Sequence, residues 1–219
     1  MASLTGAHLF IRCLKQEGIE KVFTIVGDTI LPLVEAAADE GIEFIDTRHE
    51  GAALHMADGY ARASNKPGVI LAGQNGPGAT NLVTGIAQAA AAFSPVVSIA
   101  GSFSTGDKVQ DAFQGIDQQS LFKPITKKTW TIKNTNKIPK IFSEAFNIAM
   151  SPRRGPVQIN LPRNILSAKA NFSIDQSKKS YDSESFLKPK KNDIKKSAKI
   201  ILNSIKPVII AGGGIKYTA

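Results

Sequence analysis

What this 219-residue sequence lacks excludes several classes of protein. It has a single cysteine, Cys13, so an intrachain disulfide framework is excluded. No apolar run approaches the roughly 20 residues that a membrane-spanning helix needs. The first six residues lack the basic start and long apolar core of a secretory signal peptide. These absences together predict a cytoplasmic protein with no membrane partner.

Acidic residues are scarce toward the end of the chain. Residues 166–219 carry 11 lysines against four acidic residues, and this segment supplies most of the net charge of +9. A lysine-rich segment can bind nucleic acid through the phosphates, but aromatic side chains spaced for base stacking are missing. We therefore expect a solvated linker here and no nucleic-acid partner.

Short apolar runs alternate with helical patterns over residues 4–165. Strands are predicted at residues 22–26, 42–45, 69–72, 95–100, 129–132 and 157–161, and helices at 4–16, 31–40, 82–93 and 138–150, with another starting near residue 50. This alternation is typical of βαβ units, and continuously apolar strands are typical of sheets covered on both sides. The sequence predicts an α/β fold with a doubly wound, mostly parallel sheet and helices on both faces.

A change in composition divides the chain near residue 168. Residues 171–192 are rich in Lys, Ser and Asp and have little apolar periodicity, which is typical of a linker. Residues 194–205 have a helical pattern, and residues 207–214 resemble the first strand and turn of a second α/β domain. We predict one domain over 1–168, a linker over 169–192 and the truncated start of a central domain over 193–219. The sequence is thus interpreted as a fragment of a longer protein.

One acidic residue is predicted where a strand ends and a tightly packed helix begins. The strand at residues 42–45, expected to be buried, leads to Glu50, and small residues recur after it. Ligands of open α/β sheets bind in the crevice at the carboxyl ends of the strands. Taken alone, however, Glu50 is more typical of an acid that stabilises a helix start through the helix dipole.

A glycine-rich turn follows the next apolar strand. Gly76-Pro77-Gly78 comes directly before a helix of small residues, where glycine permits close approach of a ligand and the helix start presents free N–H groups. The turn is neither a Walker phosphate loop nor a dinucleotide fingerprint, because it lacks the residues and spacing of both. One helix and one strand separate it from Glu50, so both are expected at the carboxyl ends of neighbouring strands.

These two stretches resemble the pyrimidine-binding, N-terminal domain of thiamine-diphosphate-dependent enzymes, most closely the acetolactate synthase large subunit. The resemblance covers about residues 4–165 in unbroken order. The matching segments are Arg48-His49-Glu50, Ala57-Asp58-Gly59-Tyr60-Ala61-Arg62, residues 75–86, Asp111-Ala112-Phe113-Gln114, Pro124-Ile125-Thr126-Lys127 and Arg154-Gly155-Pro156-Val157. It implies that the catalytic glutamate of the family is Glu50, whose carboxyl group hydrogen-bonds N1′ of the aminopyrimidine and favours the 4′-imino form that removes the thiazolium C2 proton.

The resemblance also implies roles for other residues of this chain. The residues expected to contact the cofactor are Gly27, Glu50, Gly76, Pro77, Gly78 and Asn81. Phe113 is expected to line the substrate channel, and Gln114 to reach an active site across a dimer interface. No metal-ligating residue is expected in this chain.

Part of the family's site is expected outside these 219 residues. The family binds diphosphate and Mg²⁺ through a Gly-Asp-Gly…Asn motif in a C-terminal domain, and no Gly-Asp-Gly occurs here. We therefore expect the fragment to be inactive on its own. The full protein is expected to bind thiamine diphosphate and Mg²⁺ and to act in branched-chain amino acid biosynthesis as a homodimer or homotetramer. The resemblance leaves open whether the protein also binds FAD and whether it associates with a regulatory subunit.

Several positions depart from the acetolactate synthase pattern. Asp28 and Thr29 replace Gly-Ala, which puts an acid beside the cofactor approach, and Arg163 replaces a lysine. The expected function is condensation of a decarboxylated 2-oxo acid with a second carbonyl compound. One alternative is sulfoacetaldehyde acetyltransferase, because Gly73-Gln74-Asn75-Gly76-Pro77 also resembles the pattern of that enzyme. The others are another thiamine-diphosphate-dependent decarboxylase or lyase, and a non-catalytic α/β binding domain.

Overall fold

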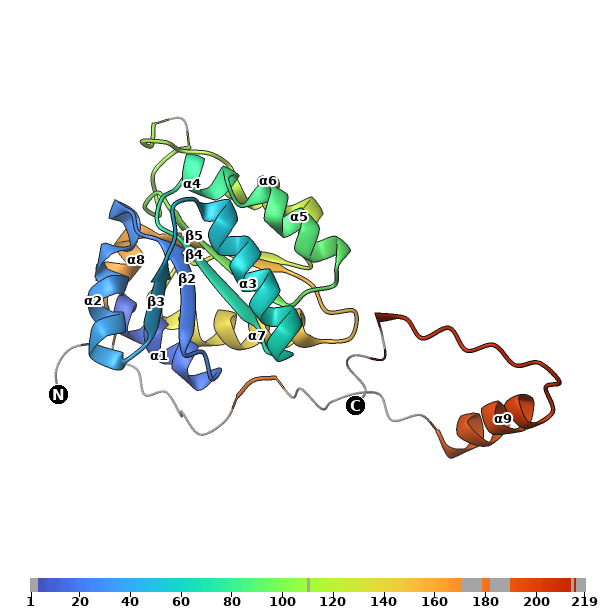
Figure 1. The fold of residues 1–219 in the computed structure, drawn as a ribbon. Coiled ribbons are helices and arrows are strands. Elements are labelled where there is room, and N and C mark those ends of the chain that lie inside the picture. The colour runs from blue at the N-terminus through green and yellow to red at the C-terminus, as the bar shows by residue number, and fades with distance from the viewer. Residues whose placement is uncertain (1–3, 110, 171–178, 182–189, 214, 216–219) are drawn as a thin grey trace. The chain divides into compact units, whose positions relative to one another are not determined.

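The computed structural model describes residues 4–109, 111–170, 179–181, 190–213 and 215, and it divides into unit 1, Met1–Asp182, and unit 2, Ser183–Ala219. Unit 1 is built on a six-stranded sheet with the strand order β3-β2-β4-β5-β7-β6 (Figure 1). The strands are β2 Lys21–Ile25, β3 Glu43–Asp46, β4 Gly68–Ala72, β5 Val96–Ser102, β6 Thr129–Thr131 and β7 Val157–Pro162. All the ladders between these strands are parallel, which confirms the predicted α/β fold.

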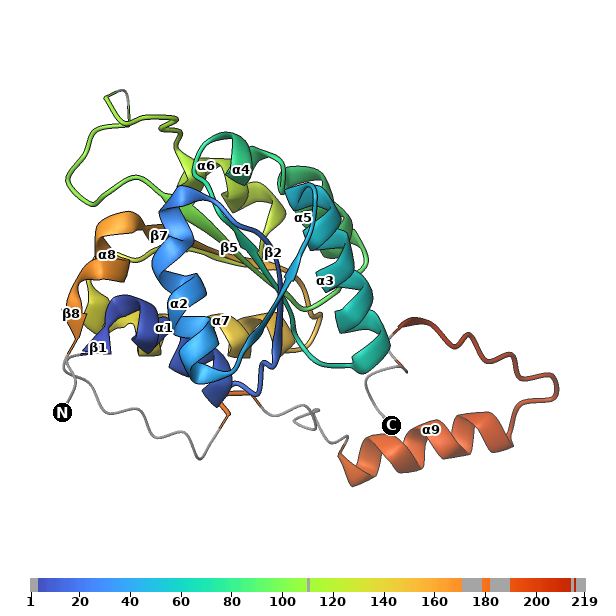
Figure 2. The same cartoon turned by 60° about the vertical axis from the view of Figure 1, so that its left-hand side comes forward.

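Helices cover both faces of the sheet (Figure 1, Figure 2). One face packs against α1 Gly6–Gln16, α2 Leu31–Glu40, α7 Ile138–Met150 and α8 Arg163–Ser167. The other packs against α3 Glu50–Ser64, α4 Pro77–Thr80, α5 Val83–Ala91 and α6 Gln118–Phe122. Among the described residues, no helix has both the length and the apolar character needed to cross a bilayer.

Each face of the sheet has its own hydrophobic core, and the central strands contribute to both. In β4, Val69 and Leu71 point into the core beneath α1 and α7, whereas Ile70 and Ala72 point into the core beneath α3 and α5. All five residues of β4 are buried. A strand buried on both sides must be apolar at consecutive positions, which explains the continuous run seen in the sequence.

The strand predicted at residues 42–45 is present but is not fully buried as expected. In β3, Phe44 and Ile45 are only half-buried, and Glu43 and Asp46 at its ends are exposed. β3 lies at the edge of the sheet and pairs with β2 alone. Its position in the sheet, and not its composition, therefore decides its burial.

Several short elements were not expected from the sequence. They are α4, α6, α8, the 3₁₀ turns η1 Asp28–Ile30, η2 Lys123–Ile125 and η3 Thr135–Lys137, and the antiparallel pair β1 Leu4–Thr5 with β8 Lys169–Ala170. Each has five residues or fewer. Hydrophobic periodicity cannot identify elements this short, because they do not complete enough of its repeat.

Part of the predicted linker packs on unit 1. The Ser180 hydroxyl donates to Glu17 Oε1 at 2.6 Å, and the Ser180 amide donates to Glu17 Oε2 at 3.0 Å. The Tyr181 ring stacks on Phe146 with 6.3 Å between ring centroids. Burial raises the pKa of Glu17, although both hydrogen bonds from Ser180 lower it. The remainder of the predicted linker falls largely on residues 171–178 and 182–189, outside the described part of the chain.

Unit 2 contains α9 Lys191–Leu202, about three residues earlier than the predicted helix. The strand predicted from residue 207 is not formed in the described residues 203–213, whose backbone is irregular. Apolar side chains at Val208, Ile209 and Ile210 are exposed. A β-strand is stabilised by pairing with a neighbour, and the described part of unit 2 contains no strand to pair with.

The environment of Cys13 predicts an unreactive thiol. Cys13 is 1% exposed in α1, and burial, with a smaller contribution from the charge of Glu17, raises its pKa to about 12. The raised pKa alone lowers the thiolate fraction at pH 8 by about 10³-fold relative to an ordinary cysteine. We expect a chromogenic thiol reagent to label Cys13 only after unfolding in denaturant. The added cysteine of a Glu35→Cys variant, at an exposed position of α2, should label at once. Equally fast labelling of Cys13 in the native protein would contradict the prediction.

Candidate functional site

The end of β3 and the start of α3 aim Glu50 into the protein. His49 caps α3, because the Gly51 amide donates to His49 Nδ1 at 3.0 Å. The Thr47 hydroxyl donates to the Thr24 carbonyl at 3.0 Å and so ties the segment before the cap to β2. Glu50, the first residue of the helix, is only 9% exposed. A carboxylate this deeply buried needs polar partners.

The partner of Glu50 comes from the glycine-rich turn, residues 76–81, which contains α4. Asn81 Nδ2 donates to Glu50 Oε2 at 2.9 Å. The second oxygen faces Gly78, where a Cβ atom would lie 3.2 Å from Glu50 Oε1. The structure therefore brings together three of the predicted site residues, Glu50, Gly78 and Asn81, at the carboxyl ends of β3 and β4.

Glycine is required at two further positions around this turn. Gly76 has φ +54°, and a Cβ atom there would lie 2.3 Å from the Gln114 carbonyl oxygen. A Cβ atom at Gly27 would lie 2.6 Å from the Gly73 carbonyl oxygen, so the ends of β2 and β4 approach each other closely. Pro77 is exposed at the first position of α4, where its missing N–H costs no helical hydrogen bond.

The loop after β5 lies against the end of β4. Gln74 Nε2 donates to Gln114 Oε1 at 3.0 Å, and Asn75 Nδ2 donates to the Phe113 carbonyl oxygen at 2.7 Å. Gln114 has φ +54°, an uncommon conformation for a residue other than glycine. The side chain of Phe113 is 79% exposed. Thus both predicted substrate or interface residues lie beside the glycine-rich turn, with Gln114 held by a side chain of its own chain.

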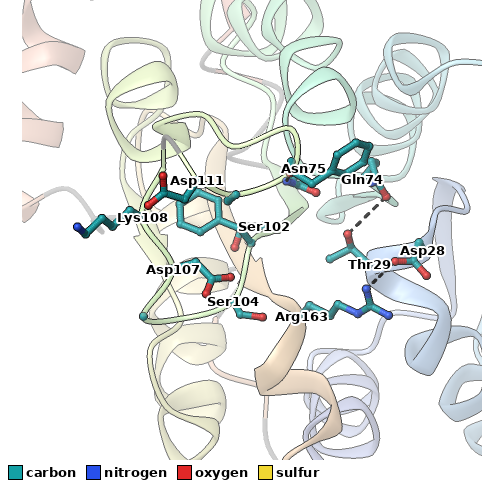
Figure 3. Close-up of a pocket in the computed structure, with 14 residues that line it drawn as sticks. Asp28, Thr29, Gln74, Asn75, Ser102, Ser104, Asp107, Lys108, Asp111 and Arg163 are labelled. Atoms are coloured by element: carbon teal, nitrogen blue, oxygen red, sulfur yellow. Dashed lines mark hydrogen bonds and ion pairs between the residues drawn. The ribbon is translucent and has the colours of Figure 1, made fainter.

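A cavity of about 570 Å³ opens at the same edge of the sheet (Figure 3). Phe113 is the predicted site residue that lines it, and Glu50 is not part of its lining. The polar and charged residues around it are Asp28, Thr29, Gln74, Asn75, Ser102, Ser104, Asp107, Lys108, Asp111 and Arg163. They come from the carboxyl ends of β2, β4, β5 and β7 and from the loop after β5.

Of the residues that line this cavity, the sequence predicts only Phe113 as part of a site. Gln74 and Asn75 carried a usable signal, because they are polar residues directly after a continuously apolar parallel strand. From the sequence, Asp28 and Arg163 stand out only as departures from the acetolactate synthase pattern. Ser102 carried no local signal.

The described residues around this site do not form a metal site. Within the part of the chain that the structure describes, no group of three or more His, Cys, Asp or Glu side chains is arranged to hold a metal ion. The chemistry available at the turn is that of the buried Glu50 carboxyl group and the Asn81 side-chain amide, beside the bare backbone of Gly78.

The sequence profile of one protein family, described as thiamine pyrophosphate enzyme, N-terminal TPP binding domain, matches residues 4–121. Among curated proteins, the chain is 44% identical over 216 residues to a probable acetolactate synthase large subunit of Methanocaldococcus jannaschii, and 41% identical over 220 residues to the acetolactate synthase large subunit of Buchnera aphidicola subsp. Schizaphis graminum. These alignments cover 97% and 98% of this chain but 36% and 38% of the relatives. The chain thus spans little more than a third of their length.

A solved structure supports the same fold. The thiamine diphosphate-dependent 4-hydroxybenzoylformate decarboxylase of Rhodococcus jostii RHA1 superimposes with a TM-score of 0.83 at 22% sequence identity, over 94% of this chain and 38% of that one. At this identity the likeness concerns the fold alone. The family profile, by contrast, matches more than half of the chain in sequence. The chain therefore belongs to the thiamine pyrophosphate enzyme family and carries its N-terminal TPP binding domain.

Proposed function

We propose that Glu50 and the glycine-rich turn hold the aminopyrimidine ring of thiamine diphosphate. The observation that carries the proposal is the placement of the Glu50 carboxyl group between Asn81 Nδ2, at 2.9 Å, and the bare face of Gly78. A side chain at Gly78 would fill the space next to Glu50 Oε1. A flat heterocycle needs such a surface, together with one hydrogen-bonding group at its edge.

The two oxygens of Glu50 have different tasks in this proposal. Asn81 engages Oε2 and fixes the orientation of the carboxyl group. Oε1 then holds a proton at N1′ of the ring. Bound thiamine diphosphate supplies a carbon nucleophile and an electron sink for decarboxylation of a 2-oxo acid. The low exposure of Glu50 keeps competing water away from its hydrogen bond.

We also propose that the whole protein condenses a decarboxylated 2-oxo acid with a second carbonyl compound. The support is the identity of 36–44% with relatives named acetolactate synthase or its large subunit. Acetolactate synthase activity would give the protein a place in branched-chain amino acid biosynthesis in the cytoplasm. The burial of Glu50 beside a glycine-rich turn argues against the alternative of a non-catalytic binding domain.

The domain assignment and the partners belong to the same proposal. Residues 1–168 form the pyrimidine-binding domain, 169–192 the linker and 193–219 the start of a central domain. A C-terminal domain supplies the diphosphate and Mg²⁺ site, and FAD and a regulatory subunit stay open. Self-association is supported by three exposed apolar side chains at the carboxyl edge of the sheet, Val26, Leu31 and Phe113.

The activity is tested with the full-length protein, thiamine diphosphate and Mg²⁺. We expect turnover of pyruvate alone and of pyruvate with 2-oxobutyrate, and none of sulfoacetaldehyde. Residues 1–219 alone should show no turnover and weak cofactor affinity, because the Gly-Asp-Gly motif is absent from them. With inorganic phosphate added, conversion of sulfoacetaldehyde and phosphate into acetyl phosphate and sulfite would favour the acetyltransferase alternative. Release of CO₂ from pyruvate by residues 1–219 would contradict the division of the site between two domains.

A further inference from the structure

The side chain of Gln74 lies between the glycine-rich turn and the loop after β5. A Cβ atom on the bare face of Gly78 would lie 3.1 Å from Gln74 Cβ and 3.2 Å from Glu50 Oε1. Gln74 and Glu50 therefore both border the surface at which we propose that the aminopyrimidine ring binds. The far end of the side chain reaches the loop, because Gln74 Nε2 donates to Gln114 Oε1 at 3.0 Å. One side chain thus links the proposed ring site to a segment 40 residues further along the chain.

The hydrogen bonds of Gln74 give its side-chain amide one direction. The Thr29 hydroxyl donates to Gln74 Oε1 at 3.4 Å (Figure 3). Thr29 is 4% exposed and packs against Gly101, where a Cβ atom would lie 2.7 Å from Thr29 Cγ2. A β-branched side chain packed in this way has little rotational freedom, so its hydroxyl stays on Gln74. With its oxygen engaged by Thr29, the Gln74 amide turns its nitrogen toward Gln114.

The direction of Gln74 decides which end of the Gln114 amide is left for another molecule. Gln114 Oε1 accepts the hydrogen bond from Gln74, so the Gln114 side-chain nitrogen, with two N–H groups, points elsewhere. Among the described residues, Gln114 Nε2 has no hydrogen-bond partner. The two ends of an amide have the same shape, so without Gln74 the Gln114 side chain could turn either end outward. As it is held here, Gln114 is a donor.

The backbone of the same loop is held by other groups. Asn75 is 5% exposed, and its Nδ2 donates to the Phe113 carbonyl oxygen at 2.7 Å. The backbone of Gly76 lies against the Gln114 carbonyl oxygen, which a Cβ atom would approach to 2.3 Å. The hydrogen bonds that the Gln74 side chain makes with described residues reach side chains alone. The position of the loop therefore depends on Asn75 and Gly76, and the direction of the Gln114 amide depends on Gln74.

We propose that Gln74 is a positioning residue that fixes Gln114 as a hydrogen-bond donor to a ligand oxygen. The chain from Thr29 through Gln74 to Gln114 passes one direction from each polar group to the next. A ligand that accepts a hydrogen bond at this point is favoured, whereas one that can only donate would leave two donors facing each other. The inference rests on the proposed function, because it adds a positioning residue to the site that contains Glu50.

Two substitutions of Gln74 in the full-length protein separate direction from mere contact. Gln74→Met keeps the length of the side chain and removes both hydrogen bonds, and should lower kcat/KM for pyruvate about tenfold. In Gln74→Glu the carboxylate can only accept, so Gln114 must turn its nitrogen to it and its oxygen to the ligand. We expect this variant to lose at least about 30-fold. In a Gln114→Met background, Gln74→Met should have no further effect, and the effect of Gln74→Glu that remains there measures its charge alone.

Two measurements need neither cofactor nor substrate. In full-length protein labelled with ¹⁵N-glutamine, the side-chain N–H protons of Gln74 should exchange with solvent more slowly than those of Gln114, and Thr29→Val should reduce the difference. Trypsin cleavage at exposed Lys108 reports whether the loop is held. Asn75→Ala should raise the cleavage rate several-fold, whereas Gln74→Met should leave it within about twofold. Gln119→Glu, which adds the same charge at an exposed glutamine of α6, is the matched control.

A residue that merely anchored the loop would give other results. Gln74→Met would then raise cleavage as much as Asn75→Ala, and Gln74→Glu, which can still accept from Thr29 and Gln114, would keep more activity than Gln74→Met. Either result, slower exchange of the Gln114 protons than of the Gln74 protons, or an undiminished effect of Gln74→Met in the Gln114→Met background would overturn the proposal. Unchanged turnover in Glu50→Gln would instead refute the proposed function and leave the exchange and cleavage results standing.

Discussion

Glu50→Gln is expected to lower the kcat of the full-length protein by at least about 10²-fold, the usual range for loss of one proton-transfer group. The amide has the same shape and can still accept the hydrogen bond from Asn81 Nδ2. It cannot hold a proton at a ring nitrogen as a carboxyl group does. The measurement is the steady-state rate of pyruvate consumption at saturating thiamine diphosphate and Mg²⁺.

Glu35→Gln is the matched control for this substitution. Glu35 is an exposed acid on α2, which covers the opposite face of the sheet from α3 and Glu50, so its loss should leave kcat unchanged. Circular dichroism would show whether both variants keep the native fold. If Glu50→Gln retains kcat within about twofold while binding the cofactor, Glu50 does not take part in proton transfer.

Gly73→Ala should lower the free energy of unfolding by about 3 kcal/mol, at the upper end of overpacking effects. A Cβ atom at Gly73 would lie 2.1 Å from the Gly27 amide nitrogen and 2.5 Å from the Ile25 carbonyl oxygen. Both are backbone atoms at the end of β2, so no side-chain rotation can relieve the clash. The Gly73 amide donates to the same Ile25 carbonyl at 3.0 Å, and this hydrogen bond would also be strained. Urea unfolding followed by circular dichroism measures the change.

Gly59→Ala is expected to have the opposite effect on the free energy of unfolding of the same protein. Gly59 lies inside α3, and apart from the neighbouring backbone of the helix itself no described atom would lie within 4 Å of an added Cβ. Alanine should raise the free energy of unfolding by about 0.5–1 kcal/mol, because glycine is entropically costly in a helix. No loss of stability in Gly73→Ala would show that backbone crowding at the β2–β4 junction is not what requires glycine. A loss of stability in Gly59→Ala would contradict the expectation for the helix.

The sequence was sufficient to predict the fold class and the approach of Glu50 to the glycine-rich turn. The apolar runs of β4 and β5 and the helical periodicity of α1, α2 and α7 are local properties, and the structure has these elements at or near the predicted bounds. The proximity of Glu50 to the glycine-rich turn could also be predicted. One helix and one strand link them, and in a parallel sheet the carboxyl ends of successive strands lie at the same edge.

Only the tertiary structure decided which strand lies at the edge and which residues meet across the sheet. β3 has an apolar middle, yet it is half exposed because the order of strands puts it outermost. Asp28 and Arg163 are far apart in the chain and meet over two intervening strands, and Ser102 belongs to the lining of the same cavity. Periodicity reports the interactions of a residue with its near neighbours in sequence. Strand order and contacts between distant segments arise from packing the whole domain, and no local pattern encodes them.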